Sequence, residues 1–159
     1  MYALSVNGER TEILLLNSAA DEVCPMLSPD GKWLAYASDE TGTYEIYVQS
    51  FSDGKLGPDR KRISTTSGRF PVWRRDGTEL FFIAQDAQLM STAVKTSGTE
   101  FSFETPKPLF KTRIMNWNLN FHELDISPDG QRFLIGTVIG EPTSPAPAVI
   151  LNWTAAMKR

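Results

Sequence analysis

The 159-residue chain contains a single cysteine, Cys24, and a single histidine, His122. One cysteine excludes an internal disulfide framework and leaves the redox compartment open. A Ser–His–Asp arrangement would have to use His122, and no motif indicates its serine. His122-Glu123 begins like the zinc-protease pattern HExxH, but Ile126 stands where the second histidine is needed and the segment is predicted to be a strand. Nucleophile-elbow, P-loop and GxGxxG motifs are also missing. The sequence therefore predicts no catalytic, metal or cofactor site.

Positive charge and long apolar runs are scarce as well. Lysine and arginine number 16 against 19 acidic residues, which gives a net charge of −3 and excludes a basic nucleic-acid footprint. No run of ~18 apolar residues occurs, so we expect no membrane insertion. The N-terminus has no basic segment followed by an apolar stretch, so we expect no signal peptide. A chain of this size can bury about 70% of its unfolded surface in one domain, which allows a genuine core.

What the sequence does contain is a repeat. Three segments match one another: 24–36, 70–82 and 122–135. Each has an Asp-Gly pair, and the pairs are spaced close to the ~40–50 residues of one four-stranded propeller blade. The first pair lies in Ser-Pro-Asp-Gly, where Pro29 presets φ and Gly31 can adopt a positive φ before the next strand. The middle copy has Arg75 in place of the proline, so its turn is less strongly preset.

The apolar runs that follow the three turns predict buried strands. Residues 34–36, 80–83 and 133–135 do not alternate polar with apolar, which is typical of strands buried on both faces. The stretch 44–49 alternates better and is predicted to be the third strand of its blade. Basic residues concentrated in 55–75 indicate a solvated strand edge that charge protects against pairing.

The strand count predicts an all-β β-propeller with about three four-stranded blades. We expect strands at 3–6 and 12–16, two sets of four near 24–63 and 70–111, and a last set of about three that ends at 149–153. The chain is then one domain, 1–159, with approximate blades 1–23 plus 121–159, 24–66, and 67–112. Three blades cannot close a ring of about 4–8. Either the chain is part of a longer protein, or two copies join by strand exchange or head to tail into a six-bladed homodimeric ring. We favour the second arrangement, because it satisfies both open edges.

A family resemblance rests on these residues. The pattern SPDGKWLAYASDE, then EIYV, then ISTTSG resembles the repeats of TolB-like β-propellers, a WD-repeat-like group. The stretch 25–159, which ends in VILNWTAAMKR, is similar to the C-terminal propeller of certain bacterial proteins, some of which carry it after a serine/threonine kinase domain and a membrane helix. The departures are Arg75, and Leu124 where the other copies have Pro25 and Pro71. The resemblance implies protein or peptide binding, or sensing, in an extracytoplasmic or periplasmic compartment.

Candidate binding residues lie on one face of the predicted propeller. Its loops are longer and more varied than the Asp-Gly turns, and loops on a rigid scaffold commonly carry function. The candidate residues of this face are Asp39, Glu40, Arg69, Arg113, Met115, Trp117 and His122. Loop carboxylates could serve glycoside hydrolysis or hold calcium, but solvated acids are the favoured interpretation. The apolar loop 111–121 either binds a partner or packs at a seam between subunits.

The expected function is therefore a non-catalytic protein- or peptide-binding or sensing module of a bacterial protein, without a cofactor. Two alternatives stay open at this point. One is an accessory propeller of a prolyl-oligopeptidase-like hydrolase, and the other is a propeller glycosidase or lyase that uses the loop carboxylates.

Overall fold

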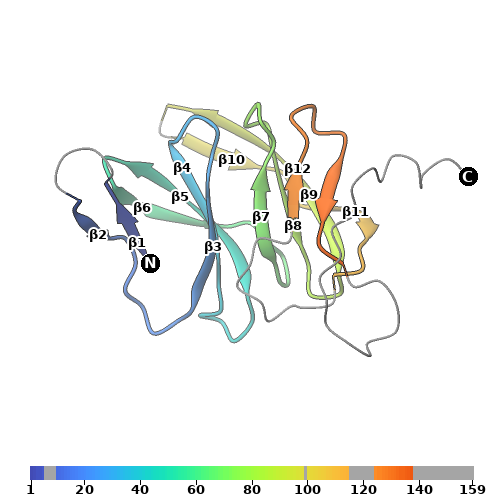
Figure 1. The fold of residues 1–159 in the computed structure, drawn as a ribbon, viewed down its shortest axis with the longest axis horizontal. Helices are drawn as coiled ribbons and strands as arrows, with labels where there is room; N and C mark the ends of the chain where they lie inside the picture. The colour runs from blue at the N-terminus through green and yellow to red at the C-terminus, as the bar shows by residue number, and fades with distance from the viewer. Residues whose placement is uncertain (6–9, 99, 115–123, 138–159) are drawn as a thin grey trace, which may run out of the picture.

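The computed structural model describes residues 1–5, 10–98, 100–114 and 124–137 (Figure 1). Every regular element within these ranges is a β-strand, and every strand pair is antiparallel, so the predicted all-β class is confirmed. The sheets remain separate and form no closed barrel in this part of the chain. No helix among the described residues has the length and apolar character needed to cross a membrane.

Two sheets, each a simple meander, form the middle of the molecule. Consecutive strands pair in chain order throughout the first sheet and through the first four strands of the second. The first sheet consists of β3 (Glu22–Leu27), β4 (Trp33–Ser38), β5 (Glu45–Ser52) and β6 (Lys55–Arg62). The second consists of β7 (Arg69–Trp73), β8 (Glu79–Ile83), β9 (Gln88–Ser97), β10 (Glu100–Phe103) and β11 (Lys107–Lys111).

The fourth strand of the second sheet is divided in two. Both β10 and β11 pair with β9, β10 with its end and β11 with its beginning. Between them, Glu104 N–H donates to Ala93 O at 3.0 Å, so the chain stays beside β9 up to this point. Pro106 follows, and a proline has no N–H for the ladder. The proline thus explains why one predicted strand appears as two.

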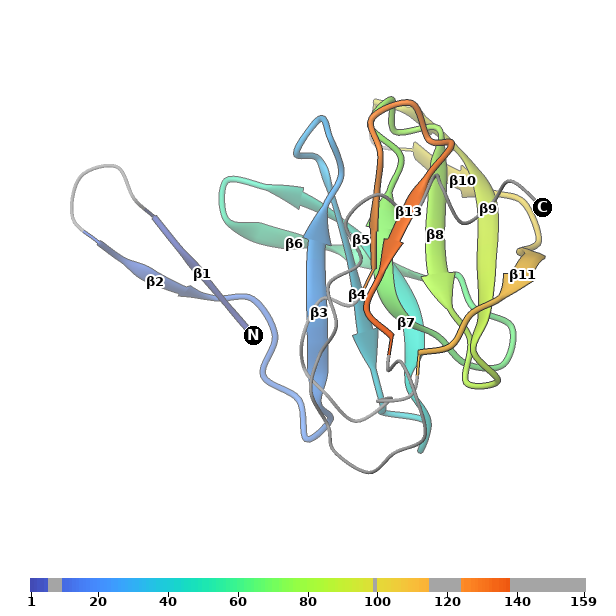
Figure 2. The same ribbon diagram turned by 45° about the vertical axis from the view of Figure 1, so that its right-hand side comes forward.

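Two short hairpins lie at opposite ends of the molecule (Figures 1 and 2). The N-terminal hairpin pairs β1 (Tyr2–Leu4) with β2 (Glu12–Leu14), and the other pairs β12 (Leu124–Ile126) with β13 (Phe133–Ile135). The first strands of successive sheets contact one another, β3 against β7 and β7 against β12. Sheets that repeat side by side with their first strands adjacent form a propeller-like arrangement.

The three Asp-Gly turns have the predicted geometry. Gly31, Gly77 and Gly130 have φ of +71°, +72° and +70°. Their N–H groups donate to the carbonyl three residues earlier, at 2.8, 2.9 and 2.8 Å respectively. The middle turn matches the others although Arg75 replaces the proline, so the aspartate and glycine are sufficient for this turn.

The aspartate side chains hold these turns in shape. Asp30 Oδ1 accepts hydrogen bonds from Ser28 Oγ at 2.6 Å and from Lys32 N–H at 3.1 Å. The Ser28 hydroxyl and, to a smaller extent, the Lys32 N–H lower the pKa of the Asp30 carboxyl against the opposing effect of burial. Hydroxyl donors of Thr78 and Ser127 lower the pKa of Asp76 and Asp129 in the same way.

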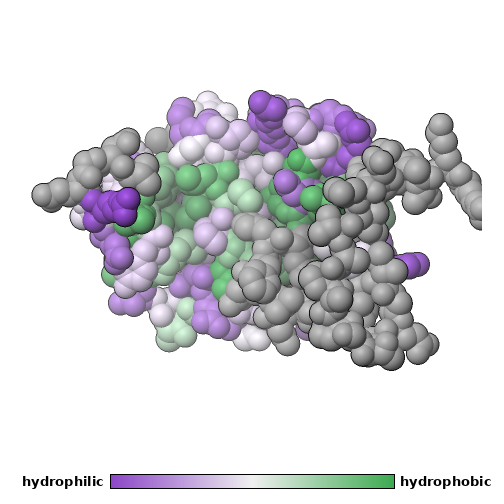
Figure 3. Space-filling view, viewed as in Figure 1, coloured by the Kyte–Doolittle hydropathy of each residue, from purple (hydrophilic) through white to green (hydrophobic). Residues whose placement is uncertain are grey.

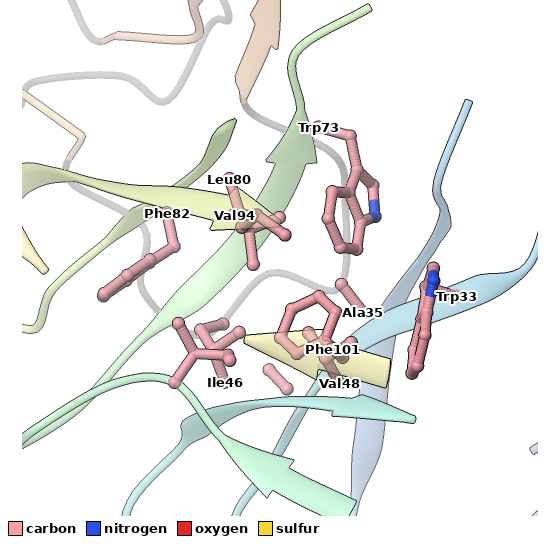
Figure 4. Close-up of a cluster of buried hydrophobic side chains, with 11 residues drawn as sticks. Trp33, Ala35, Ile46, Val48, Trp73, Leu80, Phe82, Val94 and Phe101 are labelled. Carbon is pink, nitrogen blue, oxygen red and sulfur yellow. The ribbon is translucent and has the colours of Figure 1, made fainter. Parts of the chain in front are cut away.

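The main core lies between the two four-stranded sheets (Figure 4). Phe101 lies between the indoles of Trp33 and Trp73, with ring centroids at 4.9 and 6.2 Å. The predicted two-sided burial is confirmed for 34–36 and 80–83. It is wrong for 133–135, because Leu134 is exposed on the face of β13 that points away from the second sheet.

Candidate functional site

The two predicted acidic residues lie on the loop after β4 and are engaged by neighbouring groups. Asp39 is half-buried, and its Oδ1 accepts a hydrogen bond from Asp21 N–H at 2.8 Å. Asp39 O also accepts from Gly42 N–H at 2.8 Å. Glu40 is exposed and forms an ion pair with Arg60 on the edge strand β6. Both carboxylates therefore contribute to the loop's own structure.

Arg69 corrects the sequence interpretation. It was expected on the exposed basic side of the loop face, but only 1% of its surface is exposed. Its guanidinium carbon lies 4.2 Å from the centroid of the Tyr44 ring and 5.3 Å from that of Phe70. Tyr44 comes from the loop that leads into β5, so the first sheet covers the beginning of the second. A stacked, buried guanidinium stabilises this junction and offers no open basic surface.

Tyr44 is a residue of this face that sequence reasoning missed. Burial raises the pKa of its hydroxyl, the positive charge of Arg69 opposes that rise, and the charges of Asp21 and Asp39 add to it. The same Arg69 charge acts on Cys24, where burial raises the pKa of the thiol. The structure thus stacks Arg69 on Tyr44, and it makes Cys24 a buried core residue whose thiol has a raised pKa.

A second group that sequence reasoning missed lies on the outer face of the first sheet. Glu45 is 4% exposed, and its carboxylate accepts from Tyr47 Oη at 2.9 Å, Thr41 Oγ1 at 3.1 Å and Arg62 Nη1 at 3.1 Å. Burial and the Glu45 carboxylate raise the pKa of Tyr47 to about 12. The alternation of 44–49 is real, but the polar side of the strand is buried as well, through this network.

The remaining candidates come from the loop after β11. Arg113 is exposed, and its carbonyl accepts from Thr137 Oγ1 at 3.0 Å. Ile114 is buried in the cluster that joins the second sheet to the β12–β13 hairpin. Met115, Trp117 and His122 lie outside the described residues, so their role stays a prediction. Within the described residues, no three His, Cys, Asp or Glu side chains gather closely enough to hold a metal ion.

A groove opens on the predicted loop face. Its volume is about 680 Å³, and it is open to solvent rather than enclosed. It runs between the loop before β7 and the turn that joins β8 to β9. The lining residues are Thr66, Ser67, Ala84, Gln85, Asp86, Gln88, Met90 and Pro108. Ser67 Oγ accepts Gln85 N–H at 3.0 Å, and this bond ties the two walls together.

The groove lining combines polar side chains with a larger area of apolar surface. Asp86 Oδ1 accepts Gln88 N–H at 3.1 Å, which fixes the turn, and Asp86 is exposed. The amides of Gln85 and Gln88 can each donate and accept hydrogen bonds. Met90 and Pro108 supply apolar contact area. Such a lining suits a flexible polar chain with one or two apolar side chains.

Comparisons with known proteins bear on the fold alone. No family model matches the chain, and no curated protein matches it. Among solved structures, it is similar to a putative 6-phosphogluconolactonase from Bacteroides uniformis, with a TM-score of 0.56 and 14% identity over 86% of this chain and 40% of that one. It is also similar to a protein from Lactobacillus plantarum, with a TM-score of 0.53 and 17% identity over 94% of this chain and 49% of that one.

A third similar structure is TolB from Acinetobacter baumannii, with a TM-score of 0.47 and 19% identity over 93% of this chain and 44% of that one. The chain therefore spans less than half the length of each of these proteins. Similarity at these identities shows a shared β-rich architecture and does not transfer an activity or a ligand.

Proposed function

We propose that the chain is a non-catalytic propeller module that binds a protein segment or peptide in the groove between Thr66 and Gln88. The observation that carries this proposal is the groove itself, which lies on the loop face and places hydrogen-bonding side chains beside the apolar side chains of Met90 and Pro108. An extended peptide offers N–H and C=O groups at regular intervals. The amides of Gln85 and Gln88 are suited to pair with them, and Asp86 favours a segment that carries lysine or arginine.

The carboxylates on this face favour the binding role over the glycosidase alternative only because they are engaged by neighbouring groups. Asp39 fixes its loop through Asp21 N–H, and Glu40 is paired with Arg60. A glycosidase needs two carboxyl groups that face each other across a substrate cleft. The groove is lined by a single carboxylate, that of Asp86, so its lining suits recognition better than hydrolysis.

The proposal extends to the complete ring. The first sheet has four antiparallel strands, the second has four positions of which the last is divided into β10 and β11, and the described residues before and after these sheets form two-stranded hairpins. We propose that each chain supplies about three blades and that a second copy completes a six-bladed ring, because an open arc leaves apolar sheet faces in water. The sensing role beside a kinase and the extracytoplasmic location have no support in the comparisons and stay predictions.

A random peptide library displayed on phage, selected against the full chain, tests the binding role. The enriched peptides are synthesised, and their dissociation constants are measured by isothermal titration calorimetry. We expect enriched sequences with a basic residue, and we expect Gln88→Ala and Asp86→Ala each to weaken binding about tenfold. Lys32→Ala, an exposed change at an Asp-Gly turn, is the matched control and leaves binding unchanged. A selection without enrichment, or peptides that bind the groove variants as tightly as the parent, contradicts the proposal.

A further inference from the structure

The N-terminal hairpin presents an apolar face to solvent. The register pairs Tyr2 with Leu14 and Leu4 with Glu12, so these four side chains lie on one face. Tyr2, Leu4 and Leu14 are 66%, 58% and 49% exposed. The opposite face is occupied, since Ile13 packs against Gly54 in the turn between β5 and β6. The hairpin is therefore fixed to its own first sheet on one side and uncovered on the other.

The other end of the molecule has an uncovered apolar surface as well. Phe133 of the β12–β13 hairpin packs on Phe81, with ring centroids 5.0 Å apart, and reaches Phe110 at 5.8 Å. Among the described residues, the hairpin packs on the inner strands of the second sheet and leaves much of the outer strand β11 exposed. Leu109 and Phe110 on β11 are 46% and 44% exposed. Figure 3 shows apolar residues at the surface beside the N-terminal hairpin and again beside β12.

The chain path assigns the N-terminal hairpin a place in a sheet. The outer strand β6 connects through 63–68 to β7, the inner strand of the next sheet. The strand β2 connects through 15–21 to β3, the inner strand of the first sheet, by a segment of similar length. The strands β1 and β2 thus take the third and fourth positions of a sheet that precedes the first one. The hairpin β12–β13 takes the first and second positions of a sheet that follows the second one.

We propose that the β1–β2 hairpin of one copy completes the β12–β13 sheet of a second copy, with Tyr2, Leu4 and Leu14 covering Phe110 of that copy. Strand addition gives the sheet its four strands, and the hydrogen bonds of the edge strands are satisfied in the same step. The two-fold relation repeats the contact, so both ends of each chain are covered. This seam rests on the proposed six-bladed ring and names the residues that close it.

Site-directed cross-linking tests the seam in the full chain. Two variants are made in a Cys24→Ala background, one with Leu14→Cys and one with Phe110→Cys, and they are mixed and treated with a short bismaleimide. Only a contact between copies can join them. We expect at least tenfold more covalent heterodimer than from the control mixture of Leu14→Cys with Lys61→Cys, whose lysine lies on the charged edge strand β6.

A second measurement separates the seam from the ring. Phe110→Glu places a charge in the contact, and we expect it to raise the dissociation constant of the dimer at least tenfold, whereas Lys61→Glu leaves it unchanged. A parent chain that is dimeric, with no excess cross-link and an unaltered Phe110→Glu dimer, overturns the seam and leaves the ring standing. A folded parent chain that stays monomeric overturns both, and it would make residues 138–159 the segment to examine as the cover for Phe110.

Discussion

Two interfaces between neighbouring sheets run through the molecule, and they are completed to different degrees. The first joins two four-stranded sheets, and its central aromatic residue Phe101 is 6% exposed. The second joins a four-stranded sheet to a two-stranded hairpin, and Phe110, on the same sheet as Phe101, is 44% exposed. Among the described residues, two strands thus bury the inner part of a sheet face and leave the outer strand partly exposed. An aromatic residue on an outer strand is informative because its burial reports whether the next sheet is complete.

The edge strands show the same contrast. The strand β6 has Lys55, Arg60, Lys61 and Arg62 along a solvated edge, as the sequence predicted. Every residue of β11 is exposed, yet Leu109 and Phe110 lie at its centre and keep 46% and 44% of their surface in solvent. Charge on an edge strand discourages pairing with another chain, whereas exposed apolar residues on an edge strand favour contact with another apolar surface.

The largest expected effect comes from replacing the two phenylalanines of this comparison, Phe101 and Phe110, by alanine. Phe101→Ala should lower the free energy of unfolding by about 3–5 kcal/mol, because a fully packed aromatic ring is lost from the core. Phe110→Ala should lower it by about 1–2 kcal/mol in a single chain, because nearly half of that ring already faces solvent. Urea unfolding followed by circular dichroism measures both values at a protein concentration low enough to keep chains apart.

The same unfolding measurement, repeated at several protein concentrations, tests whether a second copy covers Phe110. When the chains pair, Phe110 becomes covered, so the loss caused by Phe110→Ala should grow at high concentration while the loss caused by Phe101→Ala stays constant. Equal losses for the two variants at low concentration would show that the second interface is already complete within one chain.

A smaller effect is expected at the turns beside the two interfaces. Gly77 has a positive φ, and a Cβ added there would meet Pro29 Cδ at an ordinary 4.0 Å, so Gly77→Ala carries backbone strain alone, about 1 kcal/mol. Gly130 has a similar φ, but an added Cβ would lie 2.8 Å from Arg74 Nε. Gly130→Ala should therefore cost more, about 1–2 kcal/mol, since Arg74 must also move. Urea unfolding tests the order, and two variants as stable as the parent would show that the turns are wrongly described.

The smallest effect is a dependence on pH. The pKa of Asp30 is lowered in the folded state, chiefly by the Ser28 hydroxyl. A lowered folded pKa gives stability that is present above the unfolded value near 4 and is lost as the pH falls through the folded value. Asp30→Asn keeps an acceptor oxygen but removes the titration, so it should reduce the acid-induced loss of stability by less than about 1 kcal/mol.

Asp129→Asn at the second interface should act in the same direction, because Ser127 lowers the pKa of Asp129 in the same way. Thermal unfolding followed between pH 6 and pH 2 measures both variants. If the stability of both variants falls with decreasing pH as steeply as that of the parent, these carboxylates are not the source of the loss.

The turns could be predicted because their chemistry is local. Asp30, Asp76 and Asp129 each accept a hydrogen bond from the N–H two residues later. Pairs of Asp and Gly specify such turns without reference to the rest of the fold, which is why the middle turn forms without its proline. The Asp-Gly turns also mark where one strand ends and the next begins, so the order of the strands could be predicted as well. The division of β10 from β11 required noticing that Pro106 falls within a strand.

The environment of Arg69 could not be predicted in this way. Its burial depends on Tyr44, which comes from another sheet, and no local pattern pairs them. Glu45 is buried for a similar reason, because Arg62 arrives from the far end of β6. Leu134 shows the converse, since a continuous apolar run indicates two-sided burial only when a sheet lies on both sides. Of the candidate site, Asp39, Glu40 and Arg113 lie on loops as expected, and the groove from Thr66 to Gln88 needed the fold to bring its walls together.

Sedimentation equilibrium of the full chain across a wide range of protein concentrations tests the central claim most directly. If the second interface is completed by another copy, the mass of the well-folded protein approaches twice the 17.8 kDa of the single chain. A folded sample that keeps the mass of one chain at every concentration would contradict the account.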